Sequence, residues 1–355
     1  MNELRHSPLD SRHRALGANM TEFAGWDMPL DYGSVVAEHR SVRESCGVFD
    51  LSHLGQVEIV GPQAAATVQR ALTNDAEALP VGRAQYTLCL QPDAGIIDDL
   101  IVYRRGDDEY LAVPNAANTD AVLDVLTAAS QGQAEIRPRA WTCLAVQGPR
   151  SVGVLAAAGV DVQGLSFLDH VELGDAGGTL ARTGYTGERG YELFVPPDQA
   201  EGYWDALLDA GAQPAGLGAR DTLRLEVGYP LHGNDITRAT TPVEARLGWA
   251  IAVGTDFIGE EAYLRAKGQG RPRRLRGLRA LDRGIPRAGC ELRHDGRVVG
   301  EMTSGTFSPS LRVGIGLGYV DVGLQLADPV VIDVRGKDVP AEIVRPPFVE
   351  ADPKA

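Results

Sequence analysis

A chain of 355 residues is too long for one small core and suits two or three packed domains. Hydrophobic residues make up 44% of it and charged residues 23%, which excludes a disordered or fibrous protein. The net charge of −14 argues against binding a nucleic acid by bulk attraction. No apolar stretch approaches the roughly 18 residues of a membrane span, and the first residues lack the apolar core of a signal peptide. We therefore expect a cytoplasmic globular protein that binds neither nucleic acid nor membrane.

The motifs of several enzyme classes are missing. The four cysteines are far apart without a CxxC pair, and the seven histidines show no metal-clamp spacing. GxGxxG, GxxxxGK[ST], HExxH and GxSxG motifs are absent as well. These absences predict a site without a metal, a bound nicotinamide or a protein nucleophile.

A strand, a Gly-Pro dipeptide and a helix occur in this order twice, which indicates either two related strand–helix units or a chance match of short patterns. The two sets are 56–60, Gly61-Pro62 and 63–72, then 143–147, Gly148-Pro149 and 151–158. Apolar runs and helical periodicity add further strands and helices, which together favour α+β or α/β layers. The strands are 96–103, 110–113 and 192–195, and the helices are 119–128, one capped by Asp198, and 219–227.

The character of the chain changes near Arg265. Between Arg265 and Arg279 there are seven basic residues and no acidic ones, a segment that we name the basic run. Short apolar runs between Gly, Pro and Asp turns follow it, which is typical of a small all-β domain. We expect the boundary near 268–276, dividing the chain into 1–270 and 271–355.

Two neighbouring carboxylates stand in an otherwise apolar strand. Alternation sends the side chains of Asp98 and Asp99 to opposite faces, so at least one faces a core or a cavity. A buried carboxylate without a partner costs several kcal/mol. The pair is therefore either part of a structural salt bridge or a ligand-binding acid.

Two further stretches combine glycine, aromatic and charged residues. The glycine-rich segment 183–192 is either a loop that lets backbone approach a flat ligand or a hairpin turn with packed tyrosines. Arg220 and Arg224 are one helical turn apart. They present two guanidinium groups to a carboxylate or belong to a solvated charged face.

Taken together, these stretches resemble the glycine cleavage system T-protein family of tetrahydrofolate-dependent aminomethyltransferases. The resemblance covers nearly the whole chain. It is carried by Phe23-Ala24-Gly25-Trp26, residues 47–53, residues 95–103, Gly184-Tyr185-Thr186-Gly187-Glu188, residues 219–226, Gly233-Asn234-Asp235-Ile236, Thr241-Pro242-Val243-Glu244, Thr303-Ser304-Gly305, Ser308-Pro309-Ser310-Leu311 and Pro347-Phe348-Val349.

The resemblance implies a fold and an activity. The fold is an α+β cloverleaf of three domains around a central folate cavity, with ferredoxin-like strand–helix units, two intertwined domains in the first part and a small C-terminal β-barrel-like domain. The implied enzyme takes an aminomethyl group from the lipoyl arm of H-protein, releases ammonia and passes the methylene to tetrahydrofolate. Its implied partners are tetrahydrofolate, as co-substrate, and lipoylated H-protein, which binds transiently.

The resemblance also implies roles for individual residues. Asp99 matches the family's catalytic acid, with Asp98 as the alternative. The residues matched to folate contacts are Tyr86, Asn115, Tyr185, Glu192, Arg220 and Trp249. The chain departs from some family members near its end, where it lacks a folate-contacting tyrosine.

Alternatives remain at this point. A tetrahydrofolate-dependent demethylase or a non-catalytic folate-binding protein would share the same fold, whereas a related oxidase needs an added flavin domain for which the chain has no room. The basic run either docks H-protein, attracts a polyglutamylated folate tail or is an exposed interdomain linker.

Overall fold

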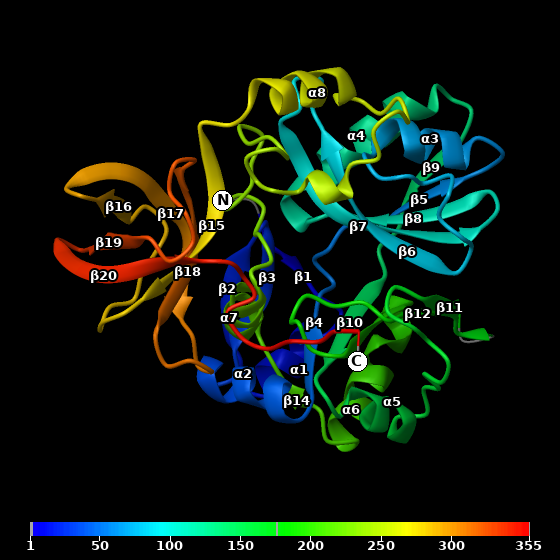
Figure 1. Cartoon of the computed structure of the whole chain (residues 1–355). Helices are drawn as coiled ribbons and strands as arrows, with labels where there is room; N and C mark the ends of the chain where they lie inside the picture. Colours follow the sequence, from blue (N-terminus) through cyan, green and yellow to red (C-terminus); the bar gives the residue numbers. More distant parts are fainter. Residues whose placement is uncertain (1–2, 175–176, 355) are drawn as a thin grey trace.

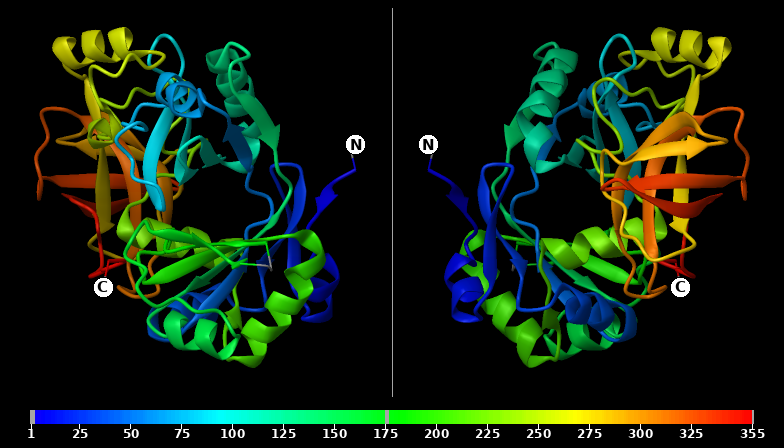
Figure 2. Two further views of the ribbon diagram at one scale, coloured as in Figure 1. Left: turned by 90° about the vertical axis from the view of Figure 1, so that its right-hand side faces the viewer. Right: turned by 90° about the vertical axis from the view of Figure 1, so that its left-hand side faces the viewer.

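A computed structural model describes residues 3–174 and 177–354. In Figure 1 the chain forms a five-stranded sheet at upper right, a six-stranded sheet at lower right and a barrel at left. The two views of Figure 2 show these parts arranged around a common centre. The expected mixed fold with a small C-terminal barrel is confirmed.

The five-stranded sheet has the order β6-β7-β8-β5-β9. Its elements are β5 (Val57–Val60), α3 (Ala64–Ala71), β6 (Arg83–Leu90), β7 (Ile96–Gly106), β8 (Glu109–Val113), the short turn η1 (Ala116–Asn118), α4 (Thr119–Ser130) and β9 (Glu135–Pro138). Apolar residues of α3 and α4, such as Val68 and Leu126, share one buried cluster with Ile59 and Val102 of the sheet. Both helices therefore cover the same face.

The six-stranded sheet has the order β11-β12-β13-β10-β4-β14. Its elements are α2 (Val35–Glu44), β4 (Gly47–Asp50), β10 (Thr142–Gln147), α5 (Ser151–Ala157), β11 (His170–Glu172), β12 (Thr179–Ala181), β13 (Gly190–Val195), η3 (Pro197–Gln199), α6 (Ala200–Asp209), β14 (Gln213–Pro214) and α7 (Leu217–Val227). Because β4 precedes the five-stranded sheet in sequence and β10 follows it, the chain leaves this sheet and returns to it. A buried cluster that includes Phe49, Tyr103 and Phe194 joins the two sheets.

The first residues form a separate small sheet, β1-β3-β2. It consists of β1 (Arg5–His6), α1 (Asp10–Ala15), β2 (Asn19–Phe23) and β3 (Trp26–Asp31). A buried network anchors this part, because the carboxylate of Asp50 on β4 accepts hydrogen bonds from Ser7 and from His13, the latter at 2.8 Å.

The barrel is closed in the order β15-β18-β17-β16-β19-β20. After η4 (Gly248–Ala250) and α8 (Glu260–Gln269), its strands are β15 (Arg273–Ala280), β16 (Glu291–His294), β17 (Arg297–Phe307), β18 (Gly314–Asp321), β19 (Pro329–Val334) and β20 (Lys337–Val344). Leu278, Val320 and Ile343 belong to the cluster that fills it. The division into 1–270 and 271–355 stays a prediction.

Two local expectations are wrong. Asp198 is not the N-cap of a helix, because it lies within the turn η3 and α6 begins at Ala200 with Gln199 at the N-cap position. The basic run is not a linker, because its first part ends α8 and its last part forms β15. Within the described residues, no helix is both long and apolar enough to cross a membrane.

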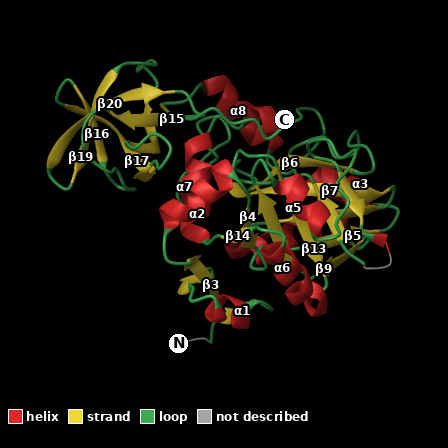
Figure 3. Cartoon of the chain, turned by 90° about the horizontal axis from the view of Figure 1, so that it is seen from below, coloured by secondary structure: helices red, strands yellow, loops and turns green. Residues whose placement is uncertain are grey.

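Helix α7 lies between the barrel and the larger sheets, as Figure 3 shows. Its Arg224 is almost fully buried and donates to Asp235 at 2.7 Å and to Ser304 of β17 at 2.8 Å. The alternative that Arg224 belongs to a solvated charged face is therefore wrong. The guanidinium is also not free for a ligand, because protein carboxylates already bind it.

We expect Asp235→Asn to lower the free energy of unfolding by about 3–5 kcal/mol, because it leaves the buried Arg224 without its main counter-charge. Chemical denaturation measures the change. Asp221→Asn is the matched control: it removes another partner of Arg224, but that side chain is 48% exposed, and its loss should cost under about 1 kcal/mol. Equal costs for the two variants would contradict the prediction.

Candidate active site

The Asp98–Asp99 pair lies where β7 extends beyond its pairing with β8. The ladder between these strands begins at Ile101 opposite Val113, so the pair faces the turn after β8 instead. Asp98 is fully buried and accepts hydrogen bonds from the backbone and side-chain amides of Asn115, both at 2.9 Å, and from the Asn118 amide at 2.7 Å. Three donors thus compensate for burying this carboxyl group.

Asp99 is half-buried and shares one of these partners. Its carboxylate accepts from the Tyr86 hydroxyl at 3.0 Å and from the Asn115 amide at 3.2 Å. Asn115 therefore bridges both acids and holds them side by side. Neither acid forms an ion pair with Lys, Arg or His in the described chain, and their partners are Tyr86, Asn115 and Asn118. Of the two alternatives, the structural salt bridge is therefore wrong.

Burial and proximity raise the pKa of both acids. For Asp98, burial and then the charge of Asp99 raise the pKa to about 7, against the hydrogen bonds from Asn115 and Asn118. Burial also raises the pKa of Asp99, against the hydrogen bond from Tyr86. Both acids therefore hold a proton more readily than an ordinary aspartate does, which suits a group that takes up and returns protons.

An aromatic pair lies next to Asp99. The rings of Tyr86 and Trp249 are stacked, with centroids 5.0 Å apart and an interplanar angle of 23°. Trp249 is 68% exposed although it is large and apolar. Burial and the charge of Asp99 raise the pKa of Tyr86 well above its usual value, so its hydroxyl remains a donor.

A second cluster contains Arg220 and Tyr185. The guanidinium of Arg220 lies 4.6 Å from the centre of the Tyr185 ring, which also stacks on Tyr229. The Tyr185 hydroxyl donates to the backbone carbonyl of Pro230. The guanidinium of Arg220 donates no hydrogen bond to any described residue. Its fork is therefore available to a carboxylate ligand.

Glu192 lies on β13 near this arginine. Its Oε2 accepts from Thr183 at 2.5 Å and from the Tyr103 hydroxyl at 3.4 Å. Burial lowers the pKa of Arg220, whereas the charges of Glu192 and Tyr185 raise it, which places all three close together. Oε1 accepts no hydrogen bond from the described residues and remains open.

The two clusters are neighbours. Burial raises the pKa of Tyr185, and the charge of Asp99 adds to that effect, while Tyr185 acts in the same way on Tyr86. The structure therefore brings all eight expected residues into one region, from β6, β7, β13, α7, the loop between β12 and β13, and the turns after β8 and before α8.

Sequence reasoning missed two supporting side chains. Nε2 of His232 donates to the carbonyl of Ile96 at 3.1 Å, and its Nδ1 accepts from the Asn118 amide at 3.0 Å. This histidine thereby orients the amide that binds Asp98. The available signal was its position just before Gly233-Asn234-Asp235, one of the family-like motifs. Asn118 had no such signal.

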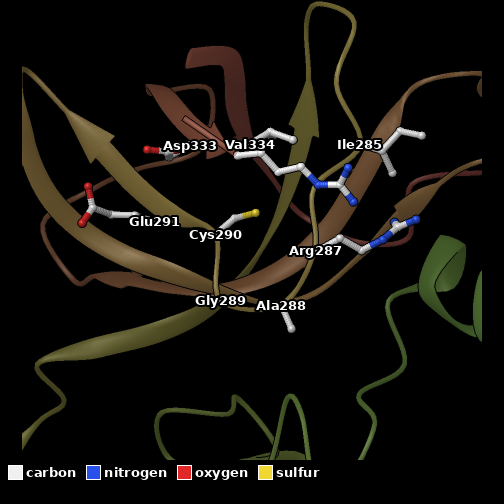
Figure 4. Close-up of a pocket in the computed structure, with 9 residues that line it drawn as sticks. Ile285, Arg287, Ala288, Gly289, Cys290, Glu291, Asp333 and Val334 are labelled. Atoms are coloured by element: carbon white, nitrogen blue, oxygen red, sulfur yellow. The ribbon is translucent and has the colours of Figure 1, made fainter. Parts of the chain in front are cut away.

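Two pockets lie away from this region. One, shown in Figure 4, is in the barrel and includes Arg287, Cys290 and Asp333, and the other lies between Glu188 and residues 347–352. Neither is lined by any of the eight residues.

Among the described residues, His6, Asp10 and Asp27 are close enough together to hold a metal ion, but Arg14 already pairs with both carboxylates.

The body of two mixed sheets and the closed barrel correspond to two known domain families. The model of the GCVT N-terminal domain matches residues 9–255, and that of the glycine cleavage T-protein C-terminal barrel domain matches residues 273–350. The chain belongs to the glycine cleavage T-protein family.

Individual relatives agree. An aminomethyltransferase of Mycobacterium bovis is 48% identical over 98% of this chain and 97% of its own length. One of Frankia alni is 47% identical over the whole of both chains. The crystal structure of the glycine cleavage system aminomethyltransferase T from Bartonella henselae superposes with a TM-score of 0.95 at 37% identity, covering 98% of this chain and 99% of that one.

The raised pKa of Asp98 predicts a pH dependence of stability. A carboxyl group with a raised folded pKa binds more protons in the folded state, so its ionisation destabilises the fold as the pH rises from the unfolded value through about 7. Asp98→Asn lacks this ionisation. We expect the stability of wild type relative to Asp98→Asn to fall by at least about 1 kcal/mol between about pH 5 and about pH 8.

Denaturation curves at several pH values measure this difference. Asp93→Asn, on the exposed turn before β7, is the control and should follow wild type. If the Asp98→Asn and wild-type profiles ran parallel, the raised pKa would be contradicted.

Proposed function

We propose that the protein is the aminomethyltransferase of the glycine cleavage system. It moves the methylene group of an S-aminomethyldihydrolipoyl H-protein to tetrahydrofolate and releases ammonia. Family membership and relatives named aminomethyltransferase support the reaction class. The observation that carries the proposal is the pair of the buried Asp98 and the half-buried Asp99, held by Asn115 and Tyr86. A cytoplasmic location stays a prediction.

The acid pair suits the proton movements of this reaction. The bond between the methylene carbon and nitrogen breaks as ammonia leaves, the carbon–sulfur bond breaks as the thiol forms, and both folate nitrogens bond to the carbon. The two protons that these nitrogens lose end on ammonia and on sulfur. Asp99 is half-buried and adjacent to an exposed aromatic ring, so we assign it this proton transfer. Asp98, fully buried, positions Asn115 and sets the charge of the pair.

The second cluster suits the other end of the co-substrate. Folate ends in a glutamate carboxylate, and Arg220 offers a fork that no described residue occupies. The open Oε1 of Glu192 accepts a hydrogen bond from an N–H donor. Tyr86, Tyr185 and Trp249 provide the aromatic faces against which a flat ring packs. Placing both reactants side by side in the right orientation supplies much of the rate enhancement.

We expect Asp99→Asn to lower the rate of methylene transfer by roughly 10²–10⁴-fold, because the amide keeps the shape but cannot exchange the proton. Folate binding should change much less. The assay supplies aminomethylated H-protein and tetrahydrofolate and follows both ammonia and 5,10-methylenetetrahydrofolate.

Asp98→Asn is the paired variant, with a smaller expected loss. Near-normal turnover of Asp99→Asn together with a large loss in Asp98→Asn would exchange their roles. Wild-type turnover of a methylated amine in place of aminomethylated H-protein would indicate a demethylase. Folate binding without any turnover would indicate a non-catalytic protein.

Arg220→Ala and Glu192→Gln should each weaken tetrahydrofolate binding by about 1.5–3 kcal/mol, because each removes a charged hydrogen-bonding group. Calorimetry with the reduced folate measures this loss. Arg265→Ala is the matched control, because Arg265 is exposed on α8 and pairs with the exposed Glu261. Unchanged affinity in both site variants would exclude these residues from the folate site.

A further inference from the structure

Two arginines of the basic run point toward the inside of the barrel. Side chains alternate along a strand, so Arg274 and Arg276 share the face of β15 that carries Leu278. Leu278 belongs to the cluster that fills the barrel. Arg276 is only 7% exposed. Two charged side chains therefore occupy the inner face where the strand begins.

Three further arginines approach the same end. Arg345 follows β20, whose Val344 is paired with Gly277 next to Arg276. Arg271 precedes β15 and donates at 2.9 Å to the carbonyl of Val243, which brings the Arg246 turn close. We name Arg246, Arg271, Arg274, Arg276 and Arg345 the arginine cluster.

Electrostatics agrees with this proximity. Burial, and then the charges of the other four arginines, lower the pKa of Arg276 to about 10. Burial, and then Arg345, Arg271 and Arg274, also lower the pKa of Arg246. Cations that repel one another are therefore gathered in a partly desolvated place.

The arginine cluster has no counter-charge in the described chain. None of its five members forms an ion pair with a described carboxylate, and the only partners are the carbonyls of Val243 and Leu324. The Nε groups of Arg274 and Arg276 are buried without a hydrogen-bond partner. Such groups are costly unless something neutralises them.

Neighbouring arginines of the same strand differ. Arg273 pairs with Glu244 at 2.9 Å, and Arg279 pairs with Glu342. Both point to the opposite face of β15. A chain with 48 acidic residues thus supplies carboxylates to the outer arginines and none to the inner ones.

The backbone adds an independent sign. Arg246 has a φ of 61°, in the left-handed region that a residue with a Cβ seldom adopts. Residues held in such conformations occur preferentially at ligand clamps and other functional positions. Arg246 forms no hydrogen bond or ion pair through its side chain with any residue that the structure describes.

We propose that the arginine cluster is a binding site for a small, multiply charged oxyanion, separate from the aminomethyltransferase site. Guanidinium groups bind such anions through forked, charge-assisted hydrogen bonds, and the two free Nε groups supply donors for them. The shared chemistry is that of a phosphate group or a short chain of carboxylates. Binding stabilises the barrel, because the anion replaces repulsion between cations with attraction.

The test compares anions at constant ionic strength. Inorganic phosphate and the tri-γ-glutamate peptide are titrated separately into the full-length protein, with sodium chloride as the reference. Unfolding temperature and calorimetry are the readouts. A saturable rise in unfolding temperature with either anion supports the site. The anion that binds more tightly shows whether the site prefers a phosphate group or a chain of carboxylates. No rise beyond that given by matched chloride overturns the proposal.

Variants locate the binding. The double variant Arg246→Gln with Arg345→Gln should bind the anion at least about tenfold more weakly. The matched control is Arg273→Gln with Arg279→Gln, which removes the same charge from the opposite face of β15 and should bind as wild type. An equal loss in both double variants would indicate bulk charge attraction and overturn the proposal.

A third variant separates anion binding from structural support. Arg276→Met removes a buried cation, so we expect a higher unfolding temperature without anion and no anion-dependent rise. If this variant instead unfolded at lower temperature and kept the anion-dependent rise, Arg276 would be structural and the site would be excluded. Because Arg345 is exposed and Arg246 is less buried than Arg276, their double variant decides the outcome if Arg276→Met fails to fold.

Discussion

The burial of charged side chains on α7 is the constraint on which the arrangement of the parts depends. Arg224 faces Asp235 and β17, while Glu226 accepts hydrogen bonds from Ser308, just after β17, and from Arg43 of α2. Burial disfavours the charge of Glu226, yet the hydrogen bonds and charges of His39, Ser308 and Arg43 hold its pKa at about 2. Buried charges tolerate little displacement, because moving one partner leaves the other unpaired. The barrel is therefore fixed on the body in one orientation.

The same helix carries Arg220 one turn before Arg224. The contacts that hold α7 against the barrel therefore also fix the position and orientation of the Arg220 guanidinium, which we assign to folate binding. A site built on a helix whose position is determined by buried ion pairs is more precise than one built on loops. The stability of the interface with the barrel and the geometry of the folate site thus both depend on α7.

Local patterns were sufficient for most elements and for the acid pair. Asp98 and Asp99 stand out because apolar neighbours on both sides predict a buried strand, and burial of a carboxyl group demands compensation. The compensating groups were not predictable, because Asn118 and His232 are far from the pair in sequence and reach it only through the fold. The burial of Arg224 was not predicted for the same reason, because its partner Ser304 lies 80 residues away. The prediction that Asp198 caps a helix was wrong for a local reason, because a short 3₁₀ turn takes the place of the first helical turn.

The segment before α8 connects the arginine cluster, whose charges are unpaired, with the exposed aromatic pair beside Asp99. Arg246 of the arginine cluster and Trp249 of the aromatic pair are separated by two residues, and Ala250 between them and α8 accepts a hydrogen bond from Thr73 at 2.8 Å. Arg271 and Leu275 hold the segment against β15 through the carbonyls of Val243 and Glu244. A short, doubly anchored segment has few alternative conformations, so an interaction that orders Arg246 reduces the freedom of Trp249 as well. The exposed ring beside Asp99 and the uncompensated arginines of the barrel are therefore parts of one continuous structure rather than separate surface features.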